Sequence, residues 1–344
     1  MRTLVRKMGS NTHKGNFDSQ EVRRILICRP NSRLGNQLMI TPLLQEIEEL
    51  FPNAKTDVFV RGFAAPILFK NYSSVNQTIR LPKKPFKELF AYAKVWVSLR
   101  KYSYDLVLNV DGDSSSGRMA TQFVKAKFRF FSDEDPELRA QFADYEHMAK
   151  FPVYNFRKYL RQLGVDVSER PVAKINIKLT DEEFAKGAEV LQNIVQNDKK
   201  TICIYTFATG PKCYTRDWWV PMYAKLQDKY GDQFNIVEVL PVENVSQIDF
   251  AAPSYYSKDL REIPALVAAS ELFLGADCGI MHLVSAVETP IVSLFSVTPI
   301  NRYQPYNDDS VALNTTQITD DDVLKTINDI LEKRNVFAEC LNQN

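Results

Sequence analysis

The chain has 344 residues, of which 45% are hydrophobic and 25% are charged, so it can bury a large core and is long enough for two domains. A formal net charge of +1 excludes a protein that binds polyanions over its whole surface, and no apolar run approaches the ~18 residues that span a bilayer. The five cysteines match no zinc or CxxC spacing, which indicates free thiols in a reducing compartment.

Residues 1–22 are polar and lack the apolar core of a secretory signal, so we expect a disordered leader or a short extension over the first strand. Predicted strands and helices then alternate, which is typical of parallel sheets covered by helices on both faces. The expected strands are 24–28, 56–60, 78–81, 106–110, 128–131, 201–206, 234–239, 272–274 and 291–294. The expected parts are an N-terminal domain 23–168, a linker 169–198 with a strand-like segment at 173–179, a C-terminal domain 199–319, and a helix and tail 320–344.

The first segment of interest follows the strand expected at 24–28. It runs from Arg33 through Gly35 and Asn36 to Pro42, and apolar residues at i, i+3, i+4 and i+7 continue it as a helix lying on a sheet.

Residues 83–102 form a segment that is rich in both basic and apolar residues. Its apolar residues Phe86, Leu89, Phe90, Ala93, Trp96 and Val97 fall on one helical face, and only Glu88 opposes its basic residues. Two interpretations stand side by side: a core-facing helix with a solvated basic side, or a surface helix that meets anionic lipid or a phosphorylated glycolipid. Arg118 and neighbouring basic residues would extend that surface.

The strand expected at 106–110 is followed by Asp111, Asp113 and a run of serines. These carboxylates either shape a turn or supply a base at the end of the strand.

Two strand ends in the second half carry the strongest signal. Thr209 and Gly210 end the strand 201–206, and Lys212 and Arg216 follow as rival cations for one anion. Asp277, Gly279, Met281 and His282 open a helix after the strand 272–274, where backbone N–H groups and the helix dipole favour phosphate. Trp218 and Trp219 either pack a helix or stack on a base, and packing is the favoured interpretation.

Together and in this order, these segments resemble glycosyltransferase family 9, the heptosyltransferase family of lipopolysaccharide assembly. The family motifs are R-x-G-D-x-x-x-x-T-P, G-x-x-x-x-K-x-W-x-x-x-x-W and D-x-G-x-M-H-x-x-A-A-x-x-x-P, and the resemblance runs from about residue 23 to residue 333. It implies the α/β GT-B fold, in which two Rossmann-like doubly wound domains face each other across a cleft.

The resemblance also implies an inverting, metal-independent transfer of a sugar, without a cofactor, from a nucleotide-diphosphate donor to a lipopolysaccharide-type or other glycan acceptor. It places the protein in the cytoplasm, or peripherally on the inner face of the inner membrane, and implies no nucleic-acid partner. The residues that match donor-binding positions are Thr209, Gly210, Lys212, Arg216, Asp277, Gly279, Met281 and His282. Those assigned to the acceptor are Arg33, Gly35 and Arg118.

One departure puts catalysis in question. Asn36 stands where the family has its catalytic aspartate, and an amide cannot act as a general base. Three explanations remain open: a base relocated to Asp111 or Asp113, catalysis assisted by solvent or substrate, and an impaired protein that binds nucleotide sugars as a scaffold. A metal at the Asp111–Asp113 pair also stays open. A dinucleotide oxidoreductase is disfavoured, because the first turn lacks GxGxxG.

Overall fold

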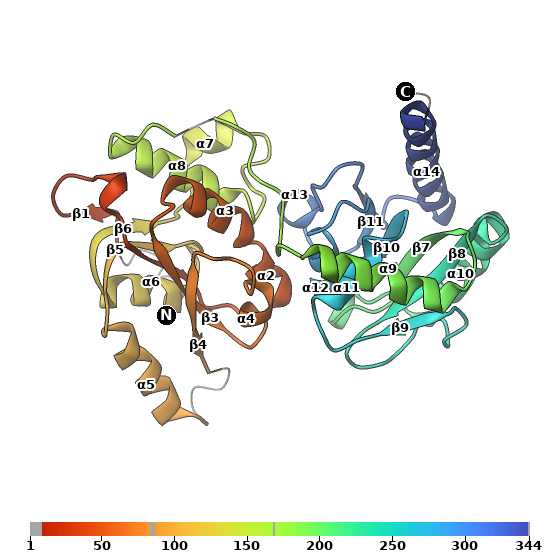
Figure 1. Cartoon of the computed structure of the whole chain (residues 1–344), viewed down its shortest axis with the longest axis horizontal. Coiled ribbons are helices and arrows are strands. Elements are labelled where there is room, and N and C mark those ends of the chain that lie inside the picture. Colours follow the sequence, from red (N-terminus) through yellow and green to blue (C-terminus); the bar gives the residue numbers. More distant parts are fainter. Residues whose placement is uncertain (1–8, 83–86, 168, 343–344) are drawn as a thin grey trace. The chain divides into compact units, whose positions relative to one another are not determined.

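The computed structural model describes residues 9–82, 87–167 and 169–342, with side chains described as far as residue 336. The chain divides between Lys178 and Leu179 into two compact units, and each unit is built around one six-stranded sheet (Figure 1). No helix of these ranges combines the length and the apolar character that crossing a bilayer requires.

The sheet of the first unit runs in the order β1-β6-β5-β2-β3-β4. All neighbours are parallel except β1, which is antiparallel to β6. Its strands are β1 (Thr12–His13), β2 (Arg24–Arg29), β3 (Lys55–Arg61), β4 (Val75–Leu81), β5 (Ser103–Asn109) and β6 (Lys125–Phe131). Ile25 to Cys28 are all fully buried, as expected for a central parallel strand that is covered on both faces.

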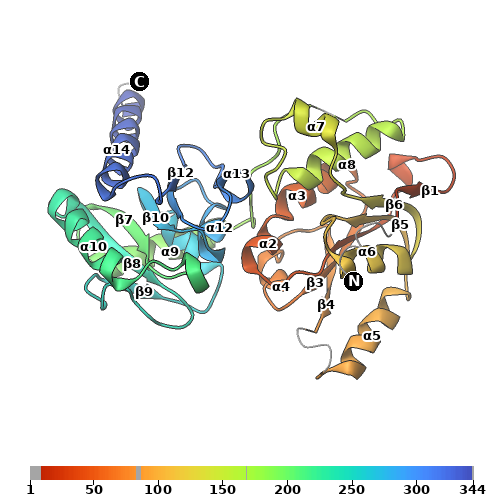
Figure 2. The ribbon, with the colours of Figure 1, turned by 180° about the vertical axis from the view of Figure 1, so that it is seen from behind.

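Helices cover both faces of this sheet (Figures 1 and 2). They are α2 (Leu34–Leu38), α3 (Thr41–Leu50), α4 (Ala65–Leu68), α5 (Leu89–Leu99), α6 (Ser115–Phe123), α7 (Pro136–Gln141) and α8 (Phe151–Gln162). α5 and α6 share a core cluster with β2, β3 and β5 on one face. On the other face α3 and α8 are joined by a buried bidentate ion pair, in which Arg157 donates two hydrogen bonds of 2.8 Å to Glu46.

The N-terminal extension adds a strand to the outer edge of this sheet. β1 pairs with β6, and the Asn11 side chain accepts a hydrogen bond of 2.7 Å from the backbone N–H of Phe131. Phe17 packs edge-on against Phe128, with ring centroids 4.9 Å apart. The described part of the extension therefore lies on β6 and not on the first long strand, because β6 is where an unpaired sheet edge is available.

The second unit has the sheet order β12-β11-β10-β7-β8-β9, with every neighbour parallel. Its strands are β7 (Lys200–Tyr205), β8 (Phe234–Leu240), β9 (Ser254–Tyr256), β10 (Leu272–Ala276), β11 (Ile291–Phe295) and β12 (Val311–Asn314). Its helices are α9 (Asp181–Val195), α10 (Arg216–Tyr230), α11 (Glu262–Val267), α12 (Gly279–Val284), α13 (Ile300–Tyr303) and α14 (Asp320–Asn342). Each of the nine strands expected within the two sheets is present.

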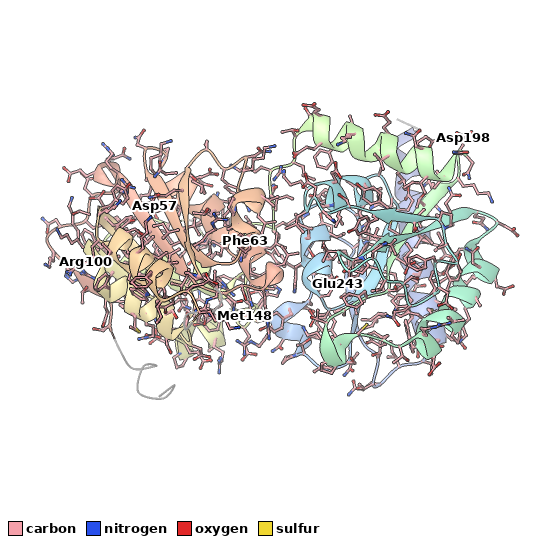
Figure 3. The ribbon with its side chains drawn as sticks, turned by 90° about the horizontal axis from the view of Figure 1, so that it is seen from below. Asp57, Phe63, Arg100, Met148, Asp198 and Glu243 are labelled. Carbon is pink, nitrogen blue, oxygen red and sulfur yellow. The ribbon has the colours of Figure 1, made fainter. Side chains whose placement is uncertain are left out.

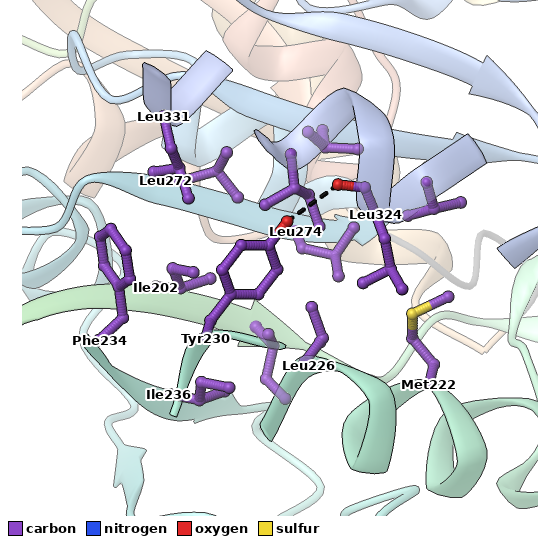
Figure 4. Packing of buried hydrophobic residues seen from close by; sticks show 14 of the residues in the cluster. Ile202, Met222, Leu226, Tyr230, Phe234, Ile236, Leu272, Leu274, Leu324 and Leu331 are labelled. Atoms are coloured by element: carbon purple, nitrogen blue, oxygen red, sulfur yellow. Dashed lines mark hydrogen bonds between the residues drawn. The ribbon is translucent and has the colours of Figure 1, made fainter. Parts of the chain in front are cut away.

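Figure 4 shows how the core of the second unit joins α10 and α14 to one face of the sheet. The Tyr230 hydroxyl donates a hydrogen bond of 2.9 Å to the Leu324 carbonyl, which ties the two helices together. Trp219 is fully buried in this cluster and Trp218 packs against it, so both tryptophans have the packing role that the sequence favoured.

The segment expected as a linker is largely taken up by the units themselves. Residues 171–180 form no strand, so the strand expected at 173–179 is wrong. Instead, side chains of the first unit hold this backbone: Gln45 donates to the Lys174 carbonyl at 2.8 Å and Tyr72 to the Asn176 carbonyl at 2.7 Å. α9 packs on α11 so closely that a Cβ at Gly187 would lie 2.3 Å from the backbone of Ala265.

Candidate functional site

The candidate residues gather where the strand order of each sheet reverses. In the second unit the chain goes from β7 outward to β8 and β9, and then returns to β10 on the other side of β7. In the first unit β2 and β5 are related in the same way. A reversal of this kind opens a crevice at the carboxyl ends of the two strands, which is where open α/β sheets bind ligands. The loops after β7 and β10, and those after β2 and β5, therefore occupy the binding positions of their units.

In the second unit a buried carboxylate joins these two loops. Asp277, directly after β10, accepts a hydrogen bond of 2.5 Å from Lys212 Nζ of the loop after β7. The Thr298 hydroxyl, after β11, donates to the same oxygen. His282 Nε2 lies 3.6 Å from Oδ1 of Asp277, and this oxygen accepts no hydrogen bond within the described residues. The structure thus brings Lys212, Asp277 and His282 together, and we call these three residues the Asp277 cluster.

The environment of Asp277 keeps it ionised. Burial by itself raises the pKa of this carboxyl, but His282, Lys212 and Thr298 stabilise the charged form more strongly and lower the pKa to about 2. Tyr303 of α13 lies over the cluster, since its ring centroid is 5.8 Å from Lys212 Nζ and 6.3 Å from that of the His282 ring.

This ionisation predicts a pH-dependent stability. The usual pKa of an aspartate in an unfolded chain is about 3.9, so a folded value of about 2 stabilises the fold above about pH 4. The contribution is lost as the pH falls toward 2. We expect Asp277→Asn to lower the free energy of unfolding of the second unit at pH 7, by on the order of 1–2 kcal/mol, and the difference from wild type to shrink between pH 4 and pH 2.

Urea unfolding of both proteins in a Trp96→Phe background measures this difference, because the other tryptophans, Trp218 and Trp219, both belong to the second unit. A difference that stays constant from pH 7 to pH 2 would show that the charge of Asp277 contributes nothing.

The start of α12 forms one wall of the site. Cys278 caps the helix, its sulfur accepting from the backbone N–H of Met281 at 3.4 Å, and burial raises the pKa of this thiol to about 12. Gly279 is the first residue of the helix, and the Met281 side chain points into the core, where it is fully buried. Met281 therefore packs in the core beneath the loop in this structure and does not line the site.

An open pocket of about 460 Å³ adjoins the Asp277 cluster within the second unit. It is lined by residues 295–301, after β11, and by Asn314 and Thr316 around the end of β12. Thr298 belongs both to this lining and to the hydrogen bonds of Asp277. The Tyr214 and Thr315 hydroxyls, 2.6 Å apart, join the loop after β7 to the same edge. Five of the nine lining residues carry hydroxyl or amide side chains, which suit a sugar or a phosphate, and the other four are apolar.

The loop after β7 separates the two rival cations. Thr209 and Gly210 are exposed, and Gly210 has a φ of +67°, a conformation that favours glycine. Lys212 reaches Asp277, whereas Arg216 forms an ion pair with Asp249 and is mostly exposed. Of the two, Lys212 is the cation that the structure places beside His282.

In the first unit, Asn36 lies on α2 and accepts a hydrogen bond of 3.1 Å from the buried Arg29. Gln37 anchors the same turn by donating to the backbone carbonyls of Asn31, at 3.1 Å, and Arg61, at 2.8 Å. Arg33 is exposed at the cap of this helix and Gly35 is buried in its first turn. Sequence analysis did not select Arg29, because only the fold brings it to Asn36.

The loop after β5 lies beside this turn, since Cys28 of β2 pairs with Asn109 of β5. Asp111 is half-buried and accepts a hydrogen bond of 3.2 Å from the backbone N–H of Asp113, which is itself exposed. Arg118 is buried: it pairs with Asp133 and donates to the Gly9 carbonyl at 2.9 Å. The charge of Arg118 is therefore neutralised within the first unit. Asp111 follows Asn109, the strand residue that pairs with Cys28, by two positions.

Comparison with known proteins finds similarity to one family of glycosyltransferases. The sequence profile described as glycosyltransferase family 9 (heptosyltransferase) matches residues 257–328, which include Asp277 and His282. Lipopolysaccharide heptosyltransferase 3 of Escherichia coli K12 is 21% identical over 296 residues, covering 80% of this chain and 84% of the relative. The matches support a place for this chain in glycosyltransferase family 9.

Solved structures of this family have the same fold. The family 9 glycosyl transferase of Veillonella parvula superposes with a TM-score of 0.73 at 16% identity, over 92% of this chain and 99% of that one. E. coli heptosyltransferase WaaC with ADP gives 0.66 at 17% identity, over 89% and 99%. The fold class is GT-B with two Rossmann-like domains, as the sequence predicted. Around the Asp277 cluster, sequence analysis did not select Thr298 and Tyr303, because no spacing links them to Asp277.

Proposed function

We propose that this family 9 chain is an inverting glycosyltransferase that needs no metal ion. It would transfer a sugar, heptose or a related one, from a nucleoside-diphosphate donor to a lipopolysaccharide-type or other glycan acceptor. The observation that carries this proposal is the Asp277 cluster, where a lysine and a histidine stand beside one carboxylate at the strand reversal of the second unit.

The cluster suits the departure of a diphosphate. When the bond between the sugar C1 and the diphosphate oxygen breaks, negative charge develops on that oxygen, and fixed donors beside it stabilise the transition state. Lys212 Nζ and the His282 ring would supply those donors, while ionised Asp277 holds both in place. Oδ1 of Asp277, which is buried and accepts no hydrogen bond among the described residues, can receive one from a hydroxyl of the donor sugar.

Inversion also needs a base that takes the proton of the acceptor hydroxyl while its oxygen attacks C1. Asn36 cannot do this, and it is held by Arg29. We assign the role to Asp111, a half-buried carboxylate at the end of the neighbouring strand. The hydrogen bond that Asn36 accepts from Arg29 also supports a second candidate, a catalytically impaired nucleotide-sugar binder with the same pocket.

The acceptor in this proposal is a glycan carried by a lipid, so the protein would work in the cytoplasm, at the inner face of a bilayer. Support comes from the relatives named as lipopolysaccharide heptosyltransferases, and from the structure of one relative with ADP.

A thermal-shift panel of ADP, GDP, UDP and their sugar derivatives tests the donor half of the proposal. A ligand at 100 times its Kd stabilises the folded state by about 2.7 kcal/mol, which corresponds to a rise of about 5–10 °C in Tm. We expect ADP and ADP-heptose to give this rise. Release of ADP that depends on a lipopolysaccharide-type acceptor then separates a transferase from a binder. No shift with any nucleotide would exclude both.

A further inference from the structure

Most of the apolar residues that the sequence places on one face of α5 are exposed, and a different side of the helix packs on the sheet. Tyr92, Val95, Trp96 and Leu99 pack onto the sheet, whereas Leu89, Phe90 and Val97 point to solvent. Phe90 is 94% exposed, Val97 66% and Leu89 61%. Leu89 and Val97 are eight residues apart, two turns along one side of the helix. Of the six residues placed on one helical face by the sequence, Trp96 packs inward and Phe86 lies outside the described residues.

α6 continues this exposed apolar surface. Met119 and Phe123, one turn apart on α6, are 44% and 37% exposed. The Phe123 ring lies 5.7 Å from that of Trp96 and 4.7 Å from the Arg100 guanidinium, so the two helices meet there. We call Leu89, Phe90, Val97, Met119 and Phe123 the α5 surface. Single exposed apolar residues are ordinary, but a group of this size on two adjacent helices marks an interaction site.

Positive charge surrounds the α5 surface. Lys87, Lys94, Arg100 and Lys101 are exposed along this segment, and Glu88 is its one acidic residue between positions 87 and 102. Arg100 lies at the surface of the first unit (Figure 3), and α5 stands at the margin of that unit in both ribbon views (Figures 1 and 2). Lys83 and Lys84 add to the charge of the sequence but lie outside the described residues.

Charge decides which partner fits this surface. Apolar side chains flanked by lysine and arginine on a short helix match the boundary between headgroups and acyl chains in a bilayer of anionic lipid. A second copy of the chain would bring like charges together, and this repulsion disfavours a dimer through the same face. α5 has 11 residues, so about 16 Å of helix is presented to the partner.

We infer that the α5 surface docks the protein on an anionic lipid bilayer, with Leu89, Phe90 and Val97 entering the headgroup boundary and Lys94, Arg100 and Lys101 facing the lipid charges. The inference rests on the proposed function only in that a lipid-carried acceptor would be met at such a surface. Docking itself needs neither donor nor acceptor.

Sedimentation of the full chain with vesicles tests it. We expect binding to phosphatidylglycerol-containing vesicles at least about tenfold stronger than to phosphatidylcholine vesicles, and weaker at high salt, because exposed charges are screened. Lys94→Gln with Lys101→Gln should weaken binding by about tenfold or more, since each basic residue near the surface contributes about 1 kcal/mol. Phe90→Asp should abolish most of the remainder, and none of these changes should lower Tm.

Matched controls come from the second unit. Val336→Asp changes a side chain of similar exposure, 61%, and Lys258→Gln with Lys325→Gln removes two exposed charges. These variants should bind vesicles within about twofold of wild type.

Three results would overturn the inference: equal binding to neutral and anionic vesicles, no binding to either, or a dimer that Phe90→Asp breaks without changing vesicle binding. The affinity of the wild-type chain for ADP is measured in parallel. Vesicle binding without ADP binding would contradict only the proposed function, and ADP binding without vesicle binding would contradict only docking.

Discussion

Replacing Asp111 with asparagine is expected to lower the rate of sugar transfer by about two to four powers of ten, the usual contribution of a general base. The change keeps the shape of the side chain and its hydrogen bond from the backbone N–H of Asp113, but the amide cannot take the proton of the acceptor hydroxyl. Donor affinity should be unchanged, because Asp111 belongs to the first unit and the Asp277 cluster to the second. Single-turnover rates at saturating donor measure the effect.

Asp113→Asn is the matched control for this experiment. Asp113 is exposed and meets Asp111 through its backbone N–H, so the substitution should leave the rate within a few-fold. Asn36→Asp should leave activity similar or lower. Arg29 would hold the new carboxylate in a charge-assisted hydrogen bond, which lowers its pKa and makes it a poorer base, and a second carboxylate would crowd the first. A many-fold gain from Asn36→Asp, with no loss from Asp111→Asn, would show that the base has not moved and that the native chain is a nucleotide-sugar binder with residual chemistry.

Lys212→Met is expected to weaken ADP binding by about ten- to a hundredfold. A charge-assisted hydrogen bond to a phosphate contributes about 1.5–3 kcal/mol, and methionine keeps the length of the side chain without the charge. The same loss is expected for His282→Ala, because the His282 ring lies beside the same carboxylate. Isothermal titration calorimetry with ADP measures both affinities.

Substitutions of two surface cations serve as controls for Lys212→Met and His282→Ala. Arg216→Met removes the rival cation, which is paired with Asp249, and Lys225→Met removes a lysine of the same helix that pairs with Asp320 at 3.1 Å. Both should change ADP affinity by less than about threefold, as expected for surface positions. If Arg216→Met causes the larger loss, the diphosphate lies over α10 and the cation at the Asp277 cluster has another role.

The nine strands expected within the two sheets are all present, because most of them are short, buried and mainly apolar runs bounded by turns, a signal that nearby residues carry by themselves. The short edge strands β1, β9 and β12 were not predicted. They are only partly buried, or exposed, and their pairing partner rather than their own composition makes them strands. α9 was assigned to a linker for a similar reason, since its place on α11 depends on the fit of Gly187 against Ala265.

The sequence by itself determined the doubly wound alternation and the Asp277–His282 turn, since both are a matter of residue types at short spacing. That Asn36 replaces an aspartate is implied by the resemblance to glycosyltransferase family 9. Only the tertiary structure places Lys212, and not Arg216, beside Asp277, because Lys212 and Asp277 are 65 positions apart and meet through the pairing of β7 with β10. It also decided which side of α5 faces the sheet. Both sides of that helix carry apolar residues, so periodicity could not choose between them, and the packing of Trp96 and Leu99 against β2, β3 and β5 did.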